Sequence, residues 1–315
     1  MTPVKIIFWA ALLPGTIALL GAFASRFSER STTRWLVAAG VTGGYMAGQL
    51  GIVGWQGFDG DVTHGLLVLA LMGAFFGALE SFFDHGALRW TLRVVGSLAA
   101  SWLLLRPLLP TAFLGLGGPS NTISPVAWPV LSLIFLAVWS ALHRLAAYDA
   151  GRLLPALLVL LTLSGGATVL FAGNATTGAL SGPLAATLGA IFVVGLFFPR
   201  EGLLRPAVPA IALVMVGQWS IGHFYTDHLS VVSVGLLVGG PTLLALAAPL
   251  FPPMRRVLAV ALQLSMLALP AAAAAGVAAM SYFSPPPTVV SPKDESSSSA
   301  PSTTTAAKGD DDYGY

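Results

Sequence analysis

The residues best suited to chemistry are acidic and histidine side chains that follow two similar hydrophobic segments. The first segment reads GQLGI at 48–52 and the second reads GQWSI at 217–221. After the first segment, Asp61 and His64 are three residues apart, and after the second, His223 and Asp227 are four residues apart. These spacings place each His/Asp pair on one face of a helix. Carboxylate oxygens and imidazole nitrogens are ligands for zinc and similar divalent ions. The pattern predicts a metal site formed by Asp61, His64, His223, Asp227 and His228.

This metal site requires that the two segments be neighbours in space, which spacing alone does not establish. The alternative is that histidine and aspartate gather at these positions because loops are exposed to water. In that case the side chains lie in separate loops and bind no metal. The predicted site and this alternative both stay open at the level of the sequence.

A second polar group lies between the third and fourth hydrophobic segments. Glu80 and Asp84 are four residues apart, as are Arg89 and Arg93, and His85 lies between the two pairs. Salt bridges or contacts with lipid headgroups explain this group, so we assign it no catalysis.

Other sources of chemistry find little support in the sequence. The chain contains no cysteine, which excludes thiolate nucleophiles and disulfides. It has no Walker loop, nucleophile elbow, HExxH motif or dinucleotide fingerprint in a suitable context. No cofactor can be inferred, and enzymatic activity is less expected than a noncatalytic role.

The composition predicts a protein that is embedded in lipid. Hydrophobic residues make up 56% of the 315 residues, charged residues only 9%, and the mean hydropathy is +0.82. Soluble domains are about one quarter charged. The net charge of +2 comes from scattered arginines rather than a basic patch, so nucleic acid is not an expected partner. The partner that the composition implies is the lipid bilayer of a cell membrane.

Long hydrophobic runs divide the chain into membrane-spanning helices. A transmembrane helix needs roughly twenty mostly apolar residues. We therefore expect an all-α, polytopic transmembrane bundle of about ten spans in residues 1–283, and a disordered Pro/Ser/Thr-rich acidic tail in residues 284–315. The expected spans are 6–24, 35–54, 62–79, 90–109, 126–147, 153–172, 179–198, 203–222, 229–250 and 257–283.

The distribution of basic residues predicts how these spans are oriented. The loops after the odd-numbered spans, with their helix ends, hold 11 of the 15 Lys and Arg residues. Because short cytoplasmic loops are enriched in Lys and Arg, both termini are predicted to lie on the non-cytoplasmic side. A cleaved signal peptide, suggested by Lys5 and the AFA sequence at 22–24, would reverse this pattern, so an uncleaved first helix is favoured.

Glycine spacing predicts where helices pack closely. The second span carries glycines three or four residues apart on one face, which lets another backbone approach. Gly73 and Gly77, and Gly235 and Gly239, repeat the spacing, whereas Gly178 is expected in a loop with room for a side chain. The predicted packing face consists of Gly40, Gly44, Gly48 and Gly51.

Three functions are compatible with these features. No acidic residue falls at the centre of a predicted span, which disfavours transport coupled to a buried carboxylate. The leading hypothesis is a facilitative permease or flippase-like protein with a cavity near proline-kinked helices. The second is a noncatalytic membrane subunit or assembly factor with a membrane-protein partner, and the third is a membrane enzyme that uses the His/Asp metal site.

Overall fold

The described part of the chain is helical. The computed structural model describes residues 2–27, 35–55, 62–83, 85–108, 124, 126–148, 153–199, 202–226, 229–250 and 256–283, and these contain no strand. The tail predicted at 284–315, like Asp61, Asp227 and His228 of the predicted metal site, lies outside the described residues.

Short helical segments extend three of the long helices. At the N-terminus the short α1 and a π-helical segment lead directly into α2, and a 3₁₀ turn precedes α10 and another follows α11. The elements in chain order are α1 (Pro3–Ile7), η1 (Phe8–Leu12), α2 (Leu13–Phe27), α3 (Trp35–Val53), α4 (Thr63–Phe82), α5 (Gly86–Leu105), α6 (Ala127–Tyr148), α7 (Leu153–Phe171), α8 (Ala175–Ala179), α9 (Ser181–Phe197), η4 (Arg205–Ala207), α10 (Val208–Phe224), α11 (Val231–Ala247), η5 (Ala248–Leu250) and α12 (Arg256–Phe283).

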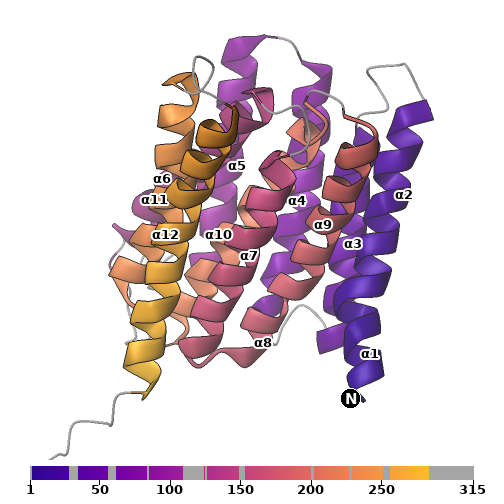
Figure 1. The fold of residues 1–315 in the computed structure, drawn as a ribbon. Coiled ribbons are helices and arrows are strands. Elements are labelled where there is room, and N and C mark those ends of the chain that lie inside the picture. The colour runs from indigo at the N-terminus through magenta and orange to yellow at the C-terminus, as the bar shows by residue number, and fades with distance from the viewer. Residues whose placement is uncertain are drawn as a thin grey trace, which may run out of the picture. The chain divides into compact units, whose positions relative to one another are not determined.

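The long helices run alternately up and down through one bundle. At the end drawn uppermost in Figure 1, here called the upper end, α2, α4, α6, α9 and α11 end and the helices that follow them begin. The N-terminus and the last residues of α12 lie at the opposite, lower end (Figure 1). The polytopic all-α bundle predicted from the sequence is thereby confirmed for the described residues.

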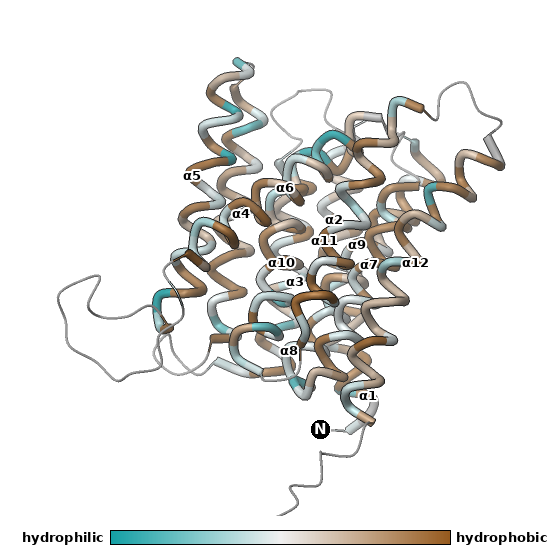
Figure 2. The backbone as a smooth tube through the Cα atoms, turned by 90° about the vertical axis from the view of Figure 1, so that its left-hand side faces the viewer, coloured by the Kyte–Doolittle hydropathy of each residue, from teal (hydrophilic) through white to brown (hydrophobic). Residues whose placement is uncertain are grey.

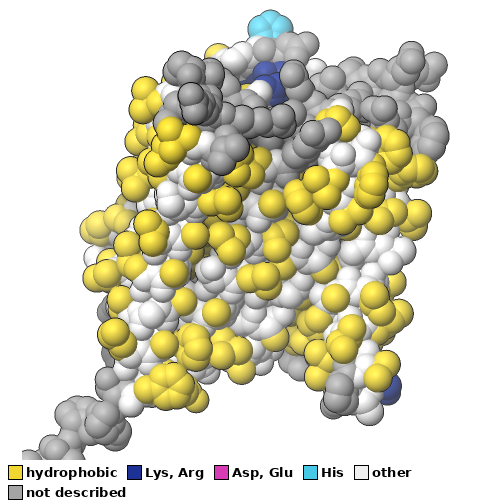
Figure 3. Space-filling view, in the orientation of Figure 1, with side chains coloured by type: hydrophobic (Ala, Val, Ile, Leu, Met, Phe, Trp, Pro, Cys, Tyr) yellow, Lys and Arg dark blue, Asp and Glu magenta, His cyan; other side chains and the backbone are white. Residues whose placement is uncertain are grey.

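Nine of the described helical segments are long and apolar enough to cross a membrane. The remaining long helix is α5, which has the same length as α4 but carries Arg89 and Arg93 in its first turns. It lies against α4 and α6 like the other members of the bundle. Hydrophobic residues occur along the helices in Figure 2. On the face drawn in Figure 3, the visible basic side chains lie at the two ends of the bundle. The chain is therefore a multi-pass membrane protein.

The centre of the bundle is α10. Every residue from Val208 to Gly222 is buried, and α10 contacts α3, α4, α5, α6, α7 and α11. A helix that is hydrophobic on all sides is stable only when other helices surround it or lipid covers it. In the peripheral helices α2 and α12 most residues are not buried, as expected of surfaces that face lipid.

The predicted glycine face of α3 packs against α2 and α9. A Cβ added to Gly44 would lie 2.5 Å from the carbonyl oxygen of Pro14 and 2.7 Å from Cγ2 of Thr187. One added to Gly48 would lie 2.6 Å from Cβ of Pro183. Gly40 faces the backbone of α2 in the same way, and Gly51 faces the ring of Trp9. These contacts show why side chains are excluded from this face.

One expectation about other glycines is wrong, and another finds no partner within the described bundle. Gly178 is not in an open loop but is buried in α8, where a Cβ would lie 2.9 Å from the carbonyl oxygen of Gly166. Gly235 and Gly239 of α11 have no atom within 4 Å of an added Cβ, so they mediate no close packing within the described bundle. Gly73 and Gly77 do meet the backbone of another segment, at 206–210.

Candidate functional site

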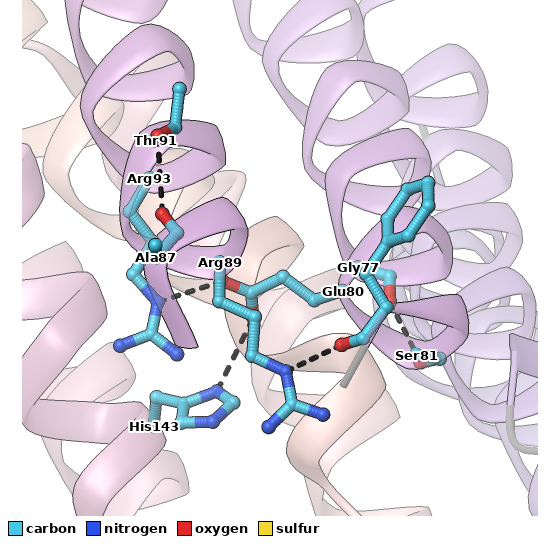
Figure 4. Close-up of polar contacts among 9 residues, drawn as sticks. Gly77, Glu80, Ser81, Ala87, Arg89, Thr91, Arg93 and His143 are labelled. Carbon is cyan, nitrogen blue, oxygen red and sulfur yellow. Dashed lines mark hydrogen bonds and ion pairs between the residues drawn. The ribbon is translucent and has the colours of Figure 1, made fainter. Parts of the chain in front are cut away.

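A buried ion pair joins α4 to α5 at the upper end. Glu80 lies in the last turn of α4 and Arg93 in the second turn of α5, and the short connection between these helices brings the two side chains together. Nε of Arg93 donates a hydrogen bond to Oε1 of Glu80 at 2.7 Å (Figure 4). Both residues are more than nine-tenths buried. Each charge therefore depends on the other, because an unpaired charge in this setting is costly.

A histidine from a third helix completes this group. Nδ1 of His143, in the last turns of α6, lies 3.4 Å from Oε2 of Glu80, which forms an ion pair when the imidazole is protonated (Figure 4). The three helices can approach because Gly96 of α5 faces the rings of Phe76 and Trp139, and a Cβ there would lie 2.8 Å from the Trp139 ring. Helix packing thus positions the polar group.

A second arginine of α5 secures the end of α4. Nε of Arg89 donates a hydrogen bond to the carbonyl oxygen of Phe83 at 2.8 Å. The last carbonyl groups of a helix have no partner within the helix, and a cation near them is favourable. Arg89 and Arg93 are therefore both held at the junction of α4 and α5.

An upper pocket of about 520 Å³ opens beside this polar group, between α5, α6 and α11. Its polar lining includes Arg93 and His143 from the buried group, the exposed Arg144 and Thr242. The remaining lining is mostly apolar: Trp90, Ala137, Ala141, Ala245 and Leu246. Trp90 and Leu246 are 54% and 68% exposed, so the pocket opens onto the side of the bundle.

A lower pocket of about 400 Å³ lies between α6, α10 and α11. It is almost entirely apolar, with Trp219 and Phe224 among its walls and His223 as one of its few polar residues. Nearby, the hydroxyl of Tyr225 donates a hydrogen bond to the carbonyl oxygen of Leu104 at 2.7 Å and ties the end of α10 to α5. Burial raises the pKa of Tyr225 to about 12, so this hydroxyl stays protonated at neutral pH.

Both pockets follow the seam between α6 and α11. On α6 the lower pocket is lined by positions from 127 to 134 and the upper pocket by positions from 137 to 144. On α11 the corresponding positions are 231 and 234, then 242, 245 and 246. The two cavities therefore lie one above the other along the same pair of helices, at two different depths in the bundle.

The structure describes two of the five residues of the predicted metal site. His64 is buried in the first turn of α4, with its ring centroid 6.3 Å from that of Trp55. His223 lies 2.8 Å from the carbonyl oxygen of Leu229, through Nδ1, and faces the lower pocket. Both are at the lower end, and α4 does pack against α10, as the prediction required. The other three residues lie outside the described residues, so the metal site stays a prediction.

Within the described ranges, no group of three or more histidine and acidic residues has the geometry to hold a metal ion.

A buried hydrogen bond of Gln49 fixes the packing of two helices. Nε2 of Gln49 donates to the carbonyl oxygen of Thr63 at 2.6 Å and links α3 to α4, as expected for a glutamine that fixes packing.

Sequence reasoning missed the joining of Glu80 and His143. It placed Glu80 at the third loop and expected salt bridges or headgroup contacts there, whereas Glu80 is a buried residue in the last turn of α4. The two residues are far apart in the sequence, and only the packing of α6 against α5 brings His143 near. The available signal was that each is an ionisable residue at the upper end of a predicted span.

The sequence matches no protein-family model, and none of the curated proteins searched is detectably similar to it. The function must therefore be argued from the geometry of the described helices and of the two pockets above.

Proposed function

We propose that this multi-pass protein is a flippase-like permease that moves an amphiphilic molecule along the seam between α6 and α11. The observation that carries this proposal is the pair of pockets at two depths on these helices. Permeases commonly bind their cargo between helices within the membrane. The upper pocket offers both polar and apolar walls, and the lower pocket offers an apolar one, which suits a molecule with a polar head and a hydrocarbon part.

The backbone of α11 supports movement at this seam. Pro241 lies inside the helix, one residue before the pocket residue Thr242. Proline lacks an N–H group and frees the carbonyl one turn earlier, which weakens the helix locally. The hydroxyl of Thr242 donates to the carbonyl oxygens of Val238 and Gly239, both at 2.9 Å. A helix weakened beside a pocket is suited to small changes in shape as cargo passes.

The polar group supports facilitative rather than ion-coupled transport. Coupling by a carboxylate needs an acid that can take up and release an ion within the membrane. Glu80 lies at the upper end of α4 and is already neutralised by Arg93. The cargo would therefore follow its own gradient.

Reconstitution into vesicles tests this function. Fluorescent phospholipid in the inner leaflet becomes accessible to an external quencher only when it is translocated. We expect Leu246→Trp, which introduces a large side chain at the pocket mouth, to lower the rate towards that of protein-free vesicles. Leu243→Trp is the control, because Leu243 is exposed on the same helix but does not line the pocket. No translocation by the unmodified protein would refute the proposal.

A noncatalytic subunit is the second candidate, favoured by the face of α11 that carries Gly235 and Gly239. Such a small-residue face can admit a helix of another membrane protein. Crosslinking from position 239 in the native membrane separates the two candidates. A single crosslinked partner protein, with no translocation by the purified chain, would favour the subunit.

We also propose that the upper end faces the cytoplasm of the cell that makes the protein. The described arginines Arg89, Arg93, Arg144 and Arg205 gather there, and cytoplasmic ends of membrane proteins are enriched in such residues. This orientation places both termini on the non-cytoplasmic side.

A further inference from the structure

The upper pocket contains a positive charge that no described side chain neutralises. Two of its lining residues are arginines, and one of them, Arg93, is paired with the carboxylate of Glu80. Arg144 lines the pocket and makes no hydrogen bond or ion pair with any other described residue. The pocket therefore contains one positive charge, that of Arg144, without a partner among the described side chains, which an anionic ligand would neutralise.

The buried arginine is held in place with donors to spare. A guanidinium has five N–H groups, and Arg93 uses its Nε for Glu80. Its terminal nitrogens point away from that carboxylate (Figure 4). The carbon at the centre of the guanidinium also lies 5.7 Å from the ring centroid of Trp90, within the range of a cation–π contact. Glu80 and Trp90 thus orient Arg93 beside the pocket without using its other donors.

A neutral donor lies in the same wall. Ser140 lines the pocket, and its hydroxyl is buried without a hydrogen-bond partner among the described residues. Buried hydroxyl groups without a partner are uncommon because losing water is costly. An anion with several oxygens can accept hydrogen bonds from a serine and arginines together.

The setting of the pocket distinguishes a lipid from a free ion. Its mouth includes exposed Trp90 and Leu246, and it opens onto the side of the bundle rather than only onto its end. Tryptophan is enriched at the level of lipid headgroups. An acidic headgroup at this level keeps its hydrocarbon chains in the membrane, whereas a free phosphate ion gains nothing from the apolar part of the wall.

We propose that the upper pocket binds the phosphate headgroup of an acidic phospholipid, with Arg144 and Arg93 as the cationic contacts and Ser140 as a hydrogen-bond donor. The identification of this lipid as cargo rests on the proposed function. It names acidic phospholipids as the class of molecule that moves along the seam between α6 and α11. Glu80 is a positioning residue, which holds Arg93 in the orientation that this binding needs.

The test is retention of defined lipids by the delipidated full chain, measured by native mass spectrometry. We expect phosphatidylglycerol to be retained in preference to phosphatidylcholine, whose headgroup has no net charge. Arg144→Gln should weaken phosphatidylglycerol retention about fivefold. This is the change in affinity that corresponds to the attraction between one arginine and an acidic membrane surface. Arg106→Gln is the control, because Arg106 is also exposed but lies at the lower end of α5. It should retain the lipid as the unmodified protein does.

Any other outcome of the retention test overturns the assignment. Equal retention of the two lipids, or equal effects of the two substitutions, would show that the pocket does not select an acidic headgroup. Stabilisation by inorganic phosphate alone, lost in Arg144→Gln, would assign the pocket to a free anion instead. Selective lipid retention without translocation in vesicles would uphold this inference while refuting the permease, so the two proposals fail separately.

Discussion

At the scale of single residues, the best defined feature is the pairing of Glu80 with Arg93. Neither side chain could be buried alone, because removing an unpaired charge from water costs more than packing returns. The pair also has a directional role, since its hydrogen bond fixes which part of the guanidinium reaches the upper pocket. His143 adds a third polar atom whose charge depends on its protonation.

Glu80→Ala should lower the free energy of unfolding by about 3 kcal/mol, because it leaves the Arg93 charge buried without a partner. Replacing both residues, as Glu80→Leu with Arg93→Met, should restore most of this loss, since no uncompensated charge remains. Unfolding in detergent, followed by circular dichroism, measures both values. If the double variant were as unstable as Glu80→Ala, the loss would come from packing rather than from charge.

At the scale of helices, close approach decides which side chains are tolerated. The face of α3 that contains Gly44 meets the backbone of α2, whereas the neighbouring Gly43 points towards a less crowded region. Adjacent glycines of one helix therefore have different roles. The intrinsic preference of a helix for alanine over glycine is the same at both positions.

Gly44→Ala should destabilise the protein by about 1–3 kcal/mol, the usual effect of adding a methyl group to a filled interface. The added Cβ would lie 2.5 Å from the carbonyl oxygen of Pro14, which belongs to the backbone and cannot easily move. Gly43→Ala is the matched control, because its Cβ would lie 3.6 Å from Cγ2 of Ile17, an ordinary contact. Thermal unfolding of the two variants in detergent measures the difference, and equal stability would contradict the packing argument.

At the scale of the whole molecule, the number of crossings depends on α5. Nine described segments meet a simple test of length and hydropathy, and α5 fails it because of the arginines near its start. In the bundle those arginines are bonded to Glu80 and to the carbonyl oxygen of Phe83 at the upper end. Their cost is thus reduced, and α5 lies beside α4 and α6 as a tenth crossing would.

Ten crossings place both termini on one side of the membrane, and the arginine-rich upper end predicts that this is the non-cytoplasmic side. Alkaline phosphatase, fused after Tyr315 in a bacterial host, should therefore be active. A fluorescent protein that folds only in the cytoplasm should stay dark at the same position. The same two fusions at the N-terminus should behave alike. Opposite results at the two termini would mean nine crossings, with α5 outside the membrane.

The sequence by itself determined the class of protein and most of its helices, because hydrophobic runs long enough to cross lipid are a local property of the chain. The second span was predicted at 35–54 and is observed at Trp35–Val53. The fourth was predicted at 90–109, but α5 begins at Gly86. Hydropathy counts every arginine as unfavourable and takes no account of the hydrogen bonds that Arg89 and Arg93 make.

Only the tertiary structure decided which helices are neighbours, and everything that depends on adjacency followed from it. Hydropathy varies along a helix but carries no information about which face meets which partner. For this reason the sequence did not predict that His143 approaches Glu80. Nor did it predict that Gly178 is crowded or that the face at Gly235 is open. The two pockets along α6 and α11 arise in the same way, because a cavity belongs to the space between helices and not to any one of them.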